Sequence, residues 1–246
     1  MNGGSNISFA LPRAELSDRE RQEMFSLFGE HFTGVTRTEF ERDLAEKNRV
    51  ILVRRESRLV GFSTLLAYET SFDDQPVSVI YSGDTIMARE AWGSAALARA
   101  WIATVNELRA SYPHGLFYWL LLTSGFRTYR FLPVFWKEFW PRFDARAPRE
   151  KQRLLDHLAS ERFGSKYEPR TGLVRFHHPQ RLRRSLAEVP AGRMTDPHVV
   201  HFLDCNPRHA EGDELVCLAS LSADNLTAAG QRMLRPDRDE AHAFAR

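Results

Sequence analysis

The most apolar part of the chain lies near its middle, where the spacing of apolar residues changes from strand-like to helix-like and back. Residues 77–87, VSVIYSGDTIM, predict a strand, and residues 94–111 carry apolar residues at helical spacing. The run LFYWLLL at 116–122 is almost wholly apolar, as a strand buried on both faces should be. Residues 126–139 predict a further helix, which Pro133 should bend or divide. The strand–helix–strand passage is long enough for a right-handed parallel crossover.

Upstream of this passage the pattern predicts two helices and then two strands. Ser17 and Thr36 are each followed three residues later by a glutamate, a spacing typical of capped helix starts. Residues 49–55 and 59–69 read as strands joined by a short turn. Together with the strand at 77–87 they predict an antiparallel meander.

The last third of the chain is more charged, and its predicted elements are shorter. We expect a helix near 150–160 and a final apolar strand, ELVCLASL, at 214–221. Weaker patterns indicate a strand at 171–176 and short helices at 179–187 and 196–203. Because the run LFYWLLL should not form the edge of a sheet, we expect the two late strands to pair beyond it.

The composition makes some classes of protein unexpected but does not indicate a reaction. The 246 residues are 43% hydrophobic and 27% charged, which is ordinary for a soluble globular chain. A formal charge of +2 does not favour nucleic acid as a partner, and no apolar run is long enough to span a membrane. Two cysteines make no disulfide framework, and residues 1–15 lack the pattern of a secretory signal. We therefore expect a cytoplasmic location.

The turn between the strand at 77–87 and the helix at 94–111 is a candidate anion site. Gly93 is the only glycine in this turn. A strand that enters a helix through small residues leaves backbone N–H groups free at the helix N-terminus, where the helix dipole also favours negative charge. The sequence therefore points to an anionic ligand at this turn.

Across residues 15–143 the order of predicted elements resembles that of the GNAT superfamily of acyl-CoA-dependent N-acyltransferases. In that family the turn carries Arg or Gln, two residues, Gly, one residue, and then Gly or Ala. Gly93 and Ala95 match the last two positions, whereas the first position is Glu90, with Arg89 one place early. The resemblance implies an α+β fold with a central mixed, mostly antiparallel sheet flanked by helices, and a C-terminal extension.

The resemblance also implies a division of the chain into four parts. We expect a flexible arm at 1–14 and a GNAT-like acyltransferase core at 15–143. Residues 144–234 would form an extension that completes the sheet and covers the acceptor site, and residues 235–246 a polar tail.

The co-substrate implied by the resemblance is acetyl-CoA or another acyl-CoA, with no metal. Its pantetheine arm would lie in the opening between the strands at 77–87 and 116–122. Arg127 and Arg130 are either phosphate contacts or solvated surface arginines. The residues expected to contact the cofactor are Ile86, Met87, Arg89, Gly93, Ser94, Ala95, Thr123 and Ser124.

Transfer of an acyl group to an amine requires a base for the attacking ammonium and can use an acid for the leaving thiolate. Asp84 is a carboxylate within an otherwise apolar or small strand, so it is our candidate base; the alternative is a turn or bulge residue bonded to nearby backbone. Tyr129 is the candidate acid, and its alternative is a packed aromatic with a satisfied hydroxyl. Ser124 is more readily explained as a helix cap.

Two further groups have competing interpretations. The aromatic residues between 131 and 140 are spaced as core residues of a helix, and an acyl tunnel is the alternative. A second group combines metal-ligand residue types, but without an established metal motif, so a helix cap and loop are favoured over a metal site. Its members are His198, His201, Asp204, Cys205 and His209.

We therefore expect an N-acyltransferase that moves an acetyl or longer acyl group from acyl-CoA, or from a carrier-protein pantetheine, to a primary amine. The alternative is a catalytically inactive GNAT-fold module that binds acyl-CoA or a protein partner. Neither nucleic acid nor a membrane is an expected partner, and a homodimer is left open.

Overall fold

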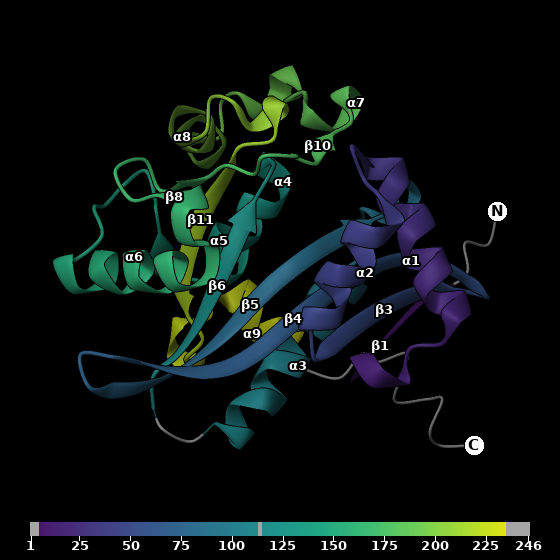
Figure 1. The fold of residues 1–246 in the computed structure, drawn as a ribbon, viewed down its shortest axis with the longest axis horizontal. Coiled ribbons are helices and arrows are strands. Elements are labelled where there is room, and N and C mark those ends of the chain that lie inside the picture. The colour runs from purple at the N-terminus through teal and green to yellow at the C-terminus, as the bar shows by residue number, and fades with distance from the viewer. Residues whose placement is uncertain (1–4, 113–114, 235–246) are drawn as a thin grey trace.

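A mixed sheet runs through the centre of the protein (Figure 1). The computed structural model describes residues 5–112 and 115–234. Within these ranges the sheet has nine strands, in the order β1-β3-β4-β5-β6-β11-β9-β8, and β7 pairs with β11. Every pair is antiparallel except β5 with β6. The strands are β1 (Asn6–Pro12), β3 (Arg49–Arg55), β4 (Arg58–Phe72), β5 (Gln75–Met87), β6 (Phe117–Thr123), β7 (Phe139–Trp140), β8 (Tyr167–Glu168), β9 (Leu173–Val174) and β11 (Glu214–Ser220).

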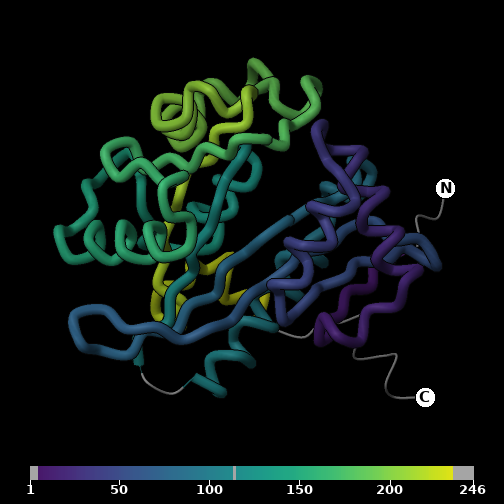
Figure 2. The backbone as a smooth tube through the Cα atoms, in the orientation of Figure 1, coloured from purple at the N-terminus to yellow at the C-terminus, as the bar shows by residue number. Residues whose placement is uncertain are grey.

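Helices pack around this sheet, and a second, two-stranded sheet joins two distant parts of the chain. In that small sheet β2 (Phe32–Thr33) pairs with β10 (Arg181–Leu182). Figure 2 follows the backbone from the N-terminal helices to the late segment that returns beside them. The helices are α1 (Asp18–His31), α2 (Arg37–Glu46), α3 (Ala96–Ser111), α4 (Phe126–Tyr129), α5 (Phe131–Phe135), α6 (Arg149–Phe163), α7 (Arg184–Ala187), α8 (Pro197–Cys205) and α9 (Ala228–Met233).

The first two helices begin where their capping residues predict. The Ser17 hydroxyl accepts a hydrogen bond from the Glu20 N–H, and the Glu20 carboxylate accepts one from the Ser17 N–H. The Thr36 hydroxyl likewise accepts from the Glu39 N–H. These bonds satisfy amides that have no partner inside the helix, and such a cap is typically worth about 1 kcal/mol.

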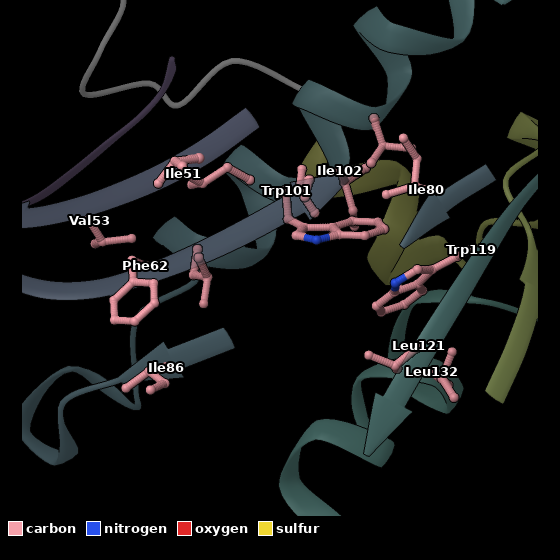
Figure 3. Packing of buried hydrophobic residues seen from close by; sticks show 14 of the residues in the cluster. Ile51, Val53, Phe62, Ile80, Ile86, Trp101, Ile102, Trp119, Leu121 and Leu132 are labelled. Carbon is pink, nitrogen blue, oxygen red and sulfur yellow. The ribbon is translucent and has the colours of Figure 1, made fainter. Parts of the chain in front are cut away.

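Side chains of β5 and β6 alternate between two apolar cores. Ile80 and Trp119 belong to the larger core, in which Trp101 of α3 packs against Trp119 with ring centroids 4.3 Å apart and the ring planes tilted by 41° (Figure 3). The neighbouring residues Val79 and Leu120 face the smaller core, where α6 packs. Burial on both faces explains why β6, and the part of β5 that pairs with it, are largely apolar.

The parallel pairing of β5 with β6 is short and ends inside both strands. It runs from Ser78 opposite Phe117 to Ser82 opposite Leu121, after which the two strands no longer pair. At the last rung the Trp119 indole N–H donates a 2.7 Å hydrogen bond to the Ser82 hydroxyl. The remaining residues of β5 continue alone beside β4, so an opening forms between the ends of β5 and β6.

The sheet continues beyond β6, as its apolar sequence predicts. β11 pairs with it from Leu215 opposite Thr123 to Ser220 opposite Tyr118. β9 lies on the far side of β11, although this strand has only two residues where the sequence suggested six. The expectation that the run LFYWLLL is not an edge strand is confirmed.

Three local expectations were wrong. Residues 6–12, placed in a flexible arm, form the edge strand β1, because Ile7, Phe9 and Leu11 alternate with polar or small residues along β3. The predicted helix at 126–139 is two short helices that meet at Arg130. Pro133 has no N–H to bond back to residue 129, which accounts for that break. The predicted helix at 179–187 is β10 followed by the four-residue α7.

Two expectations fall partly or wholly outside the structure. The polar tail at 235–246 and the first four residues lie beyond the described ranges. No helix in residues 5–112 or 115–234 is both long and apolar enough to cross a membrane.

The bond between Trp119 and Ser82 should anchor the point where the strands diverge. We expect Ser82→Ala to lower the free energy of unfolding by about 1–3 kcal/mol, because it leaves a buried indole N–H without an acceptor. Urea unfolding measures this change. Ser78→Ala is the matched control: Ser78 is buried in the same strand, but its hydroxyl has no hydrogen-bond partner among the described residues, so its loss should be smaller. Equal losses in the two variants would contradict the assigned role.

Candidate functional site

A cavity of about 720 Å³ occupies the opening between the ends of β5 and β6. Residues of β5, from Tyr81 to Met87, form one wall, and the end of β6 with α4 forms the opposite one. The start of α3 and parts of α1 and α2 complete the sides. A parallel pair that stops pairing thus supplies a ligand-sized space without breaking the core beneath it.

The inner end of the cavity is apolar. Trp101, Trp119 and Phe131 reach it from α3, β6 and α5, and Leu121 lies beside them. The same aromatic residues pack on one another, with the Trp119 and Phe131 ring centroids 6.1 Å apart. The aromatic residues between 131 and 140 are therefore divided: Phe131 lines the cavity, and Trp136 and Phe139 are fully buried core residues.

Two carboxylic acids, Asp84 and Glu214, face the cavity from β5 and β11. Both lie deep in the protein, and the accessible part of each side chain borders the cavity. Burial, followed by the negative charge of Asp43, raises the pKa of Asp84 to about 8, against the opposing effect of Lys47. Burial likewise raises the pKa of Glu214 to about 7, while a hydrogen bond with Ser124 lowers it. Near neutral pH this part of the cavity therefore holds exchangeable protons.

A fully buried lysine lies behind Asp84. The Lys47 ammonium forms a 2.7 Å ion pair with the Asp43 carboxylate and donates to the Asp43 carbonyl at 3.0 Å. Its stem passes under Gly83, where a Cβ atom would lie 2.5 Å from Lys47 Cε. The glycine next to Asp84 thus provides the space that lets an ammonium approach the base of the cavity.

The N-terminus of α3 opens into the same cavity. Leu97 and Ala98, in its first turn, are lining residues. The Ser94 hydroxyl accepts from the Ala96 N–H, and the first hydrogen bond back from the helix is Arg99 N–H to the Ala95 carbonyl. The intervening amides have no acceptor in the part of the chain that the structure describes, so they and the helix dipole can hold an anion.

Arginines gather beside this helix start. Arg127 and Arg193 line the cavity. Burial, and then the positive charges of Arg89 and Arg193, lower the pKa of Arg127. The Arg127 guanidinium lies 4.7 Å from the Trp92 ring centroid and donates to the Leu186 carbonyl at 2.7 Å. This concentration of positive charge is the second feature, after the helix N-terminus, that favours a phosphorylated ligand.

The end of β5 offers one unpaired amide to the cavity. The Ala88 N–H donates to the Val60 carbonyl of β4, and amides alternate in direction along a strand, so the Met87 N–H points to the open side and the Ile86 N–H to β4. The Met87 carbonyl is fixed by a 2.7 Å hydrogen bond from the Trp92 indole N–H. Of the two expected residues, Met87 therefore turns its backbone N–H to the open side, and Ile86 lines the cavity without an amide directed into it.

The segment around β10 roofs the cavity. Arg181 pairs with Thr33, and the Arg183 guanidinium donates to the Gly29 carbonyl at 2.7 Å. Phe176 and Leu182 of this segment are lining residues. Figure 1 shows β10 and α7 above the opening, between α4 and α1.

Other expected cofactor residues are separated by the structure. Ser94 lines the cavity, whereas Gly93 and Ala95 lie in the turn without lining it, and a Cβ on Gly93 would meet no atom within 4 Å. Arg89 lies at the rim, where its guanidinium contacts the Ser185 hydroxyl. Ser124 lines the cavity, and Arg130 does so while paired with Asp196 at 2.8 Å.

The structure does not bring Thr123 or Tyr129 into the cavity. The Thr123 hydroxyl donates to the Leu215 carbonyl between β6 and β11. Tyr129 is fully buried, and its hydroxyl donates a 2.8 Å hydrogen bond to the Pro141 carbonyl. Its ring packs against Phe202 of α8. Tyr129 is therefore a core residue with a satisfied hydroxyl, and the expected role as general acid does not fit its position.

Glu90, the acidic residue in the turn, points away from the helix start. Its carboxylate forms a 3.1 Å ion pair with Arg58, and its carbonyl accepts from Arg55. The departure from the GNAT pattern at this position consequently places no negative charge in the cavity.

The histidine-rich group lies around α8, away from the cavity lining. The Cys205 thiol is 3.5 Å from His201 Nε2, and His209 contacts the carbonyl groups of Asn206 and Ala187. Among the described residues no three metal-ligand side chains are placed to bind one ion.

Sequence reasoning missed Glu214, Asp43 and Lys47. Glu214 opens the last apolar strand, which was expected to pair next to LFYWLLL, so its carboxylate could have been assigned to the opening. Asp43 and Lys47 are spaced as an ordinary surface pair on a helix. Only the fold shows that this pair lies against Asp84.

Comparisons with known proteins give partial similarity. No family model matches the sequence, and no curated protein matches it. Among solved structures, an Enterococcus faecalis protein described as a probable N-acyltransferase is similar at a TM-score of 0.41 and 14% identity, over 51% of this chain and 31% of that one. Glucosamine-6-phosphate N-acetyltransferase from Arabidopsis thaliana is similar at 0.34 and 11%, over 47% and 81%. An aminoglycoside acetyltransferase from an uncultured soil sample is similar at 0.34 and 14%, over 66% and 91%.

This chain thus spans less than a third of the Enterococcus protein. The fold assignment rests on the chain's own strand order, its crossover helix α3 and the diverging parallel pair β5–β6. The chain therefore has the mixed, mostly antiparallel sheet flanked by helices that the sequence predicts.

Proposed function

We propose that this protein is an N-acyltransferase that transfers an acyl group from coenzyme A, or from a carrier-protein pantetheine, to a primary amine. The observation that carries the proposal is one cavity lined by two groups of residues with opposite chemistry. Unpaired amides at the start of α3 and two arginines form what we call its basic end, and two proton-holding carboxyl groups, on β5 and β11, form what we call its acidic end.

The donor fits the basic end. A pyrophosphate would accept hydrogen bonds from the first-turn amides of α3, with Arg127 and Arg193 supplying charge. The pantetheine arm would then run along the exposed edge of β5 beside the Met87 N–H. The apolar floor at Trp101 and Trp119 accommodates an acyl group, from acetyl to longer chains.

The acceptor fits the acidic end. Asp84 in its ionised form takes a proton from the attacking ammonium, and the free amine nitrogen attacks the thioester carbonyl carbon. A C–N bond forms, the nitrogen loses its second proton to water, the C–S bond breaks, and the departing thiolate takes up a proton from water, so that the products are the amide and the free thiol. Holding the two substrates next to each other in a reactive orientation increases the rate further. With Tyr129 outside the cavity, no protein acid is required, because a thiolate is a moderate base.

A binding module without catalysis is the second candidate, and the absence of Tyr129 from the cavity favours it. A thiol-release assay with a panel of acyl-CoAs and primary amines distinguishes the two functions. Thiol release that depends on the amine supports the enzyme, and tight acyl-CoA binding without release supports the module.

A negative charge placed at the start of α3 should weaken the binding of acyl-CoA. We expect Gly93→Glu to raise the acyl-CoA dissociation constant at least tenfold, because its carboxylate repels the phosphates at the helix N-terminus. The fold should tolerate the change, since a Cβ there meets no atom within 4 Å. Isothermal titration calorimetry with acetyl-CoA measures the effect. Gly93→Gln, of similar size but neutral, should bind markedly tighter than the glutamate variant; unchanged affinity in Gly93→Glu would place the phosphates elsewhere.

Removal of the proposed base should lower kcat without weakening the binding of acyl-CoA. We expect Asp84→Asn to lower kcat by about 10²–10⁴, the usual effect of losing a general base. The acyl-CoA dissociation constant should stay within about threefold, because the phosphates bind at the other end of the cavity. Steady-state kinetics and calorimetry on the same preparation test both points. A variant with full turnover would exclude Asp84 as the base.

The pH dependence of the rate should report the coupling of the two carboxyl groups. Because the pKa of Asp84 is about 8, kcat/KM should rise with pH through that value as the base ionises. Glu214 is one of the charges that raise this pKa, so Glu214→Gln should move the midpoint to lower pH. Profiles between pH 5.5 and 9.5 measure the shift. A midpoint that stays in place, or moves to higher pH, contradicts the coupling.

A further inference from the structure

The acidic end of the cavity carries more negative than positive charge when its groups are ionised. Three carboxylates meet there, Asp43, Asp84 and Glu214, and the Lys47 ammonium acts on Asp43 and Asp84. The Lys47 ammonium already forms an ion pair with the Asp43 carboxylate, 2.7 Å away. Within the described residues the Asp84 carboxyl group forms neither a hydrogen bond nor an ion pair, and Ser124 is the hydrogen-bond partner of Glu214.

The surrounding elements do not offset this excess. Arg162 of α6 acts on the adjacent Tyr81 but is bound to Glu46. Glu39 and Arg42 of α2 border the cavity with opposite charges. His31 from α1 and His178 from the roof also line it. Two negative charges are therefore left for a ligand to neutralise.

We propose that the acceptor is a small molecule with two ammonium groups joined by an apolar spacer, one group at Asp84 and the other at Glu214. The inference rests on the N-acyltransferase function proposed above and names the class of its amine substrate. A monoamine would leave one of the two deep carboxylates without a partner when both are ionised.

The same cavity has aromatic walls that suit an apolar spacer. Phe28 and Phe40 reach the cavity from α1 and α2, and Phe176 reaches it from the roof. The roof is tied down by the β2–β10 pair, and a cavity of about 720 Å³ must also hold the donor arm. These limits favour a short diamine over a large polycation.

Binding of such a ligand should release protons. In the empty cavity burial keeps the pKa of both carboxyl groups high, so they retain protons at pH 7. Two ammonium groups stabilise the ionised forms, and the protons leave to solvent. A monoamine should release fewer.

The test is titration calorimetry on the full chain without any acyl donor. The probes are α,ω-diaminoalkanes of three to eight carbons and the n-alkylamines of the same length, each in two buffers with different ionisation enthalpies at pH 7. We expect at least one diamine to bind tenfold or more tightly than its monoamine, with net proton release. Monoamines that bind as tightly as every diamine, or diamine binding without proton release, would overturn the proposal.

Variants test whether Glu214 is responsible for the preference for the diamine. Glu214→Gln should reduce the preference for the diamine at least fivefold, while Glu188→Gln, an exposed glutamate paired with Arg184, should preserve it. A preference that is equal in both variants would contradict the proposal. Because the parent protein alone reports the preference, a Glu214 variant that fails to fold does not remove the test.

The two proposals can fail separately. Diamine binding with proton release but no amine-dependent thiol release would leave the site assignment intact and contradict catalysis. Efficient transfer to monoamines with no diamine preference would contradict the substrate class and support the transferase.

Discussion

The site depends on the point at which β5 and β6 stop pairing. Up to Ser82 and Leu121 the two strands share a parallel ladder, and beyond it their backbone groups are released from each other. Unpaired amides are costly in an apolar interior, so the open edge of β5 requires either water or a ligand with acceptors. The same divergence exposes the start of α3 and the start of β11 to one space. The features proposed to bind the donor and the acceptor therefore both depend on the divergence of β5 from β6.

The second constraint is electrostatic. Two deep carboxyl groups within one cavity are hard to ionise together, and Lys47 offsets only part of their repulsion because it is shared with Asp43. A protein without a use for them would be expected to pair or exchange them, since unpaired buried charge is unfavourable. Here the two carboxyl groups share one cavity, and the glycine beside Asp84 leaves room for the Lys47 ammonium. Such a local departure from favourable packing is typical of functional sites.

The sequence predicted the order of the main elements because their signals are local. Caps at Ser17 and Thr36 and the apolar run of β6 each depend on neighbouring residues only. Asp84 stood out because its strand is otherwise apolar, and the structure does place it in the cavity. Tyr129 was misplaced because the direction of its phenol depends on where the helix breaks, at Arg130, and on packing against Phe202 of α8, neither of which a local pattern shows. Lys47 and the roof at β10 could not be found, since both act across contacts between distant segments.

The pairing of β6 with β11 affects how the chain folds during its synthesis. Leu215 follows its partner Thr123 by 92 residues, so on a ribosome adding about 5–20 residues per second the strand LFYWLLL waits roughly 5 to 20 seconds for its neighbour. During that interval an apolar edge is exposed while the N-terminal helices and β1–β5 are already complete. The nascent protein is then most vulnerable to association with other chains, and β11 acts as the strand that ends this period. The enclosed cavity, whose roof is also encoded late, is among the last features to form.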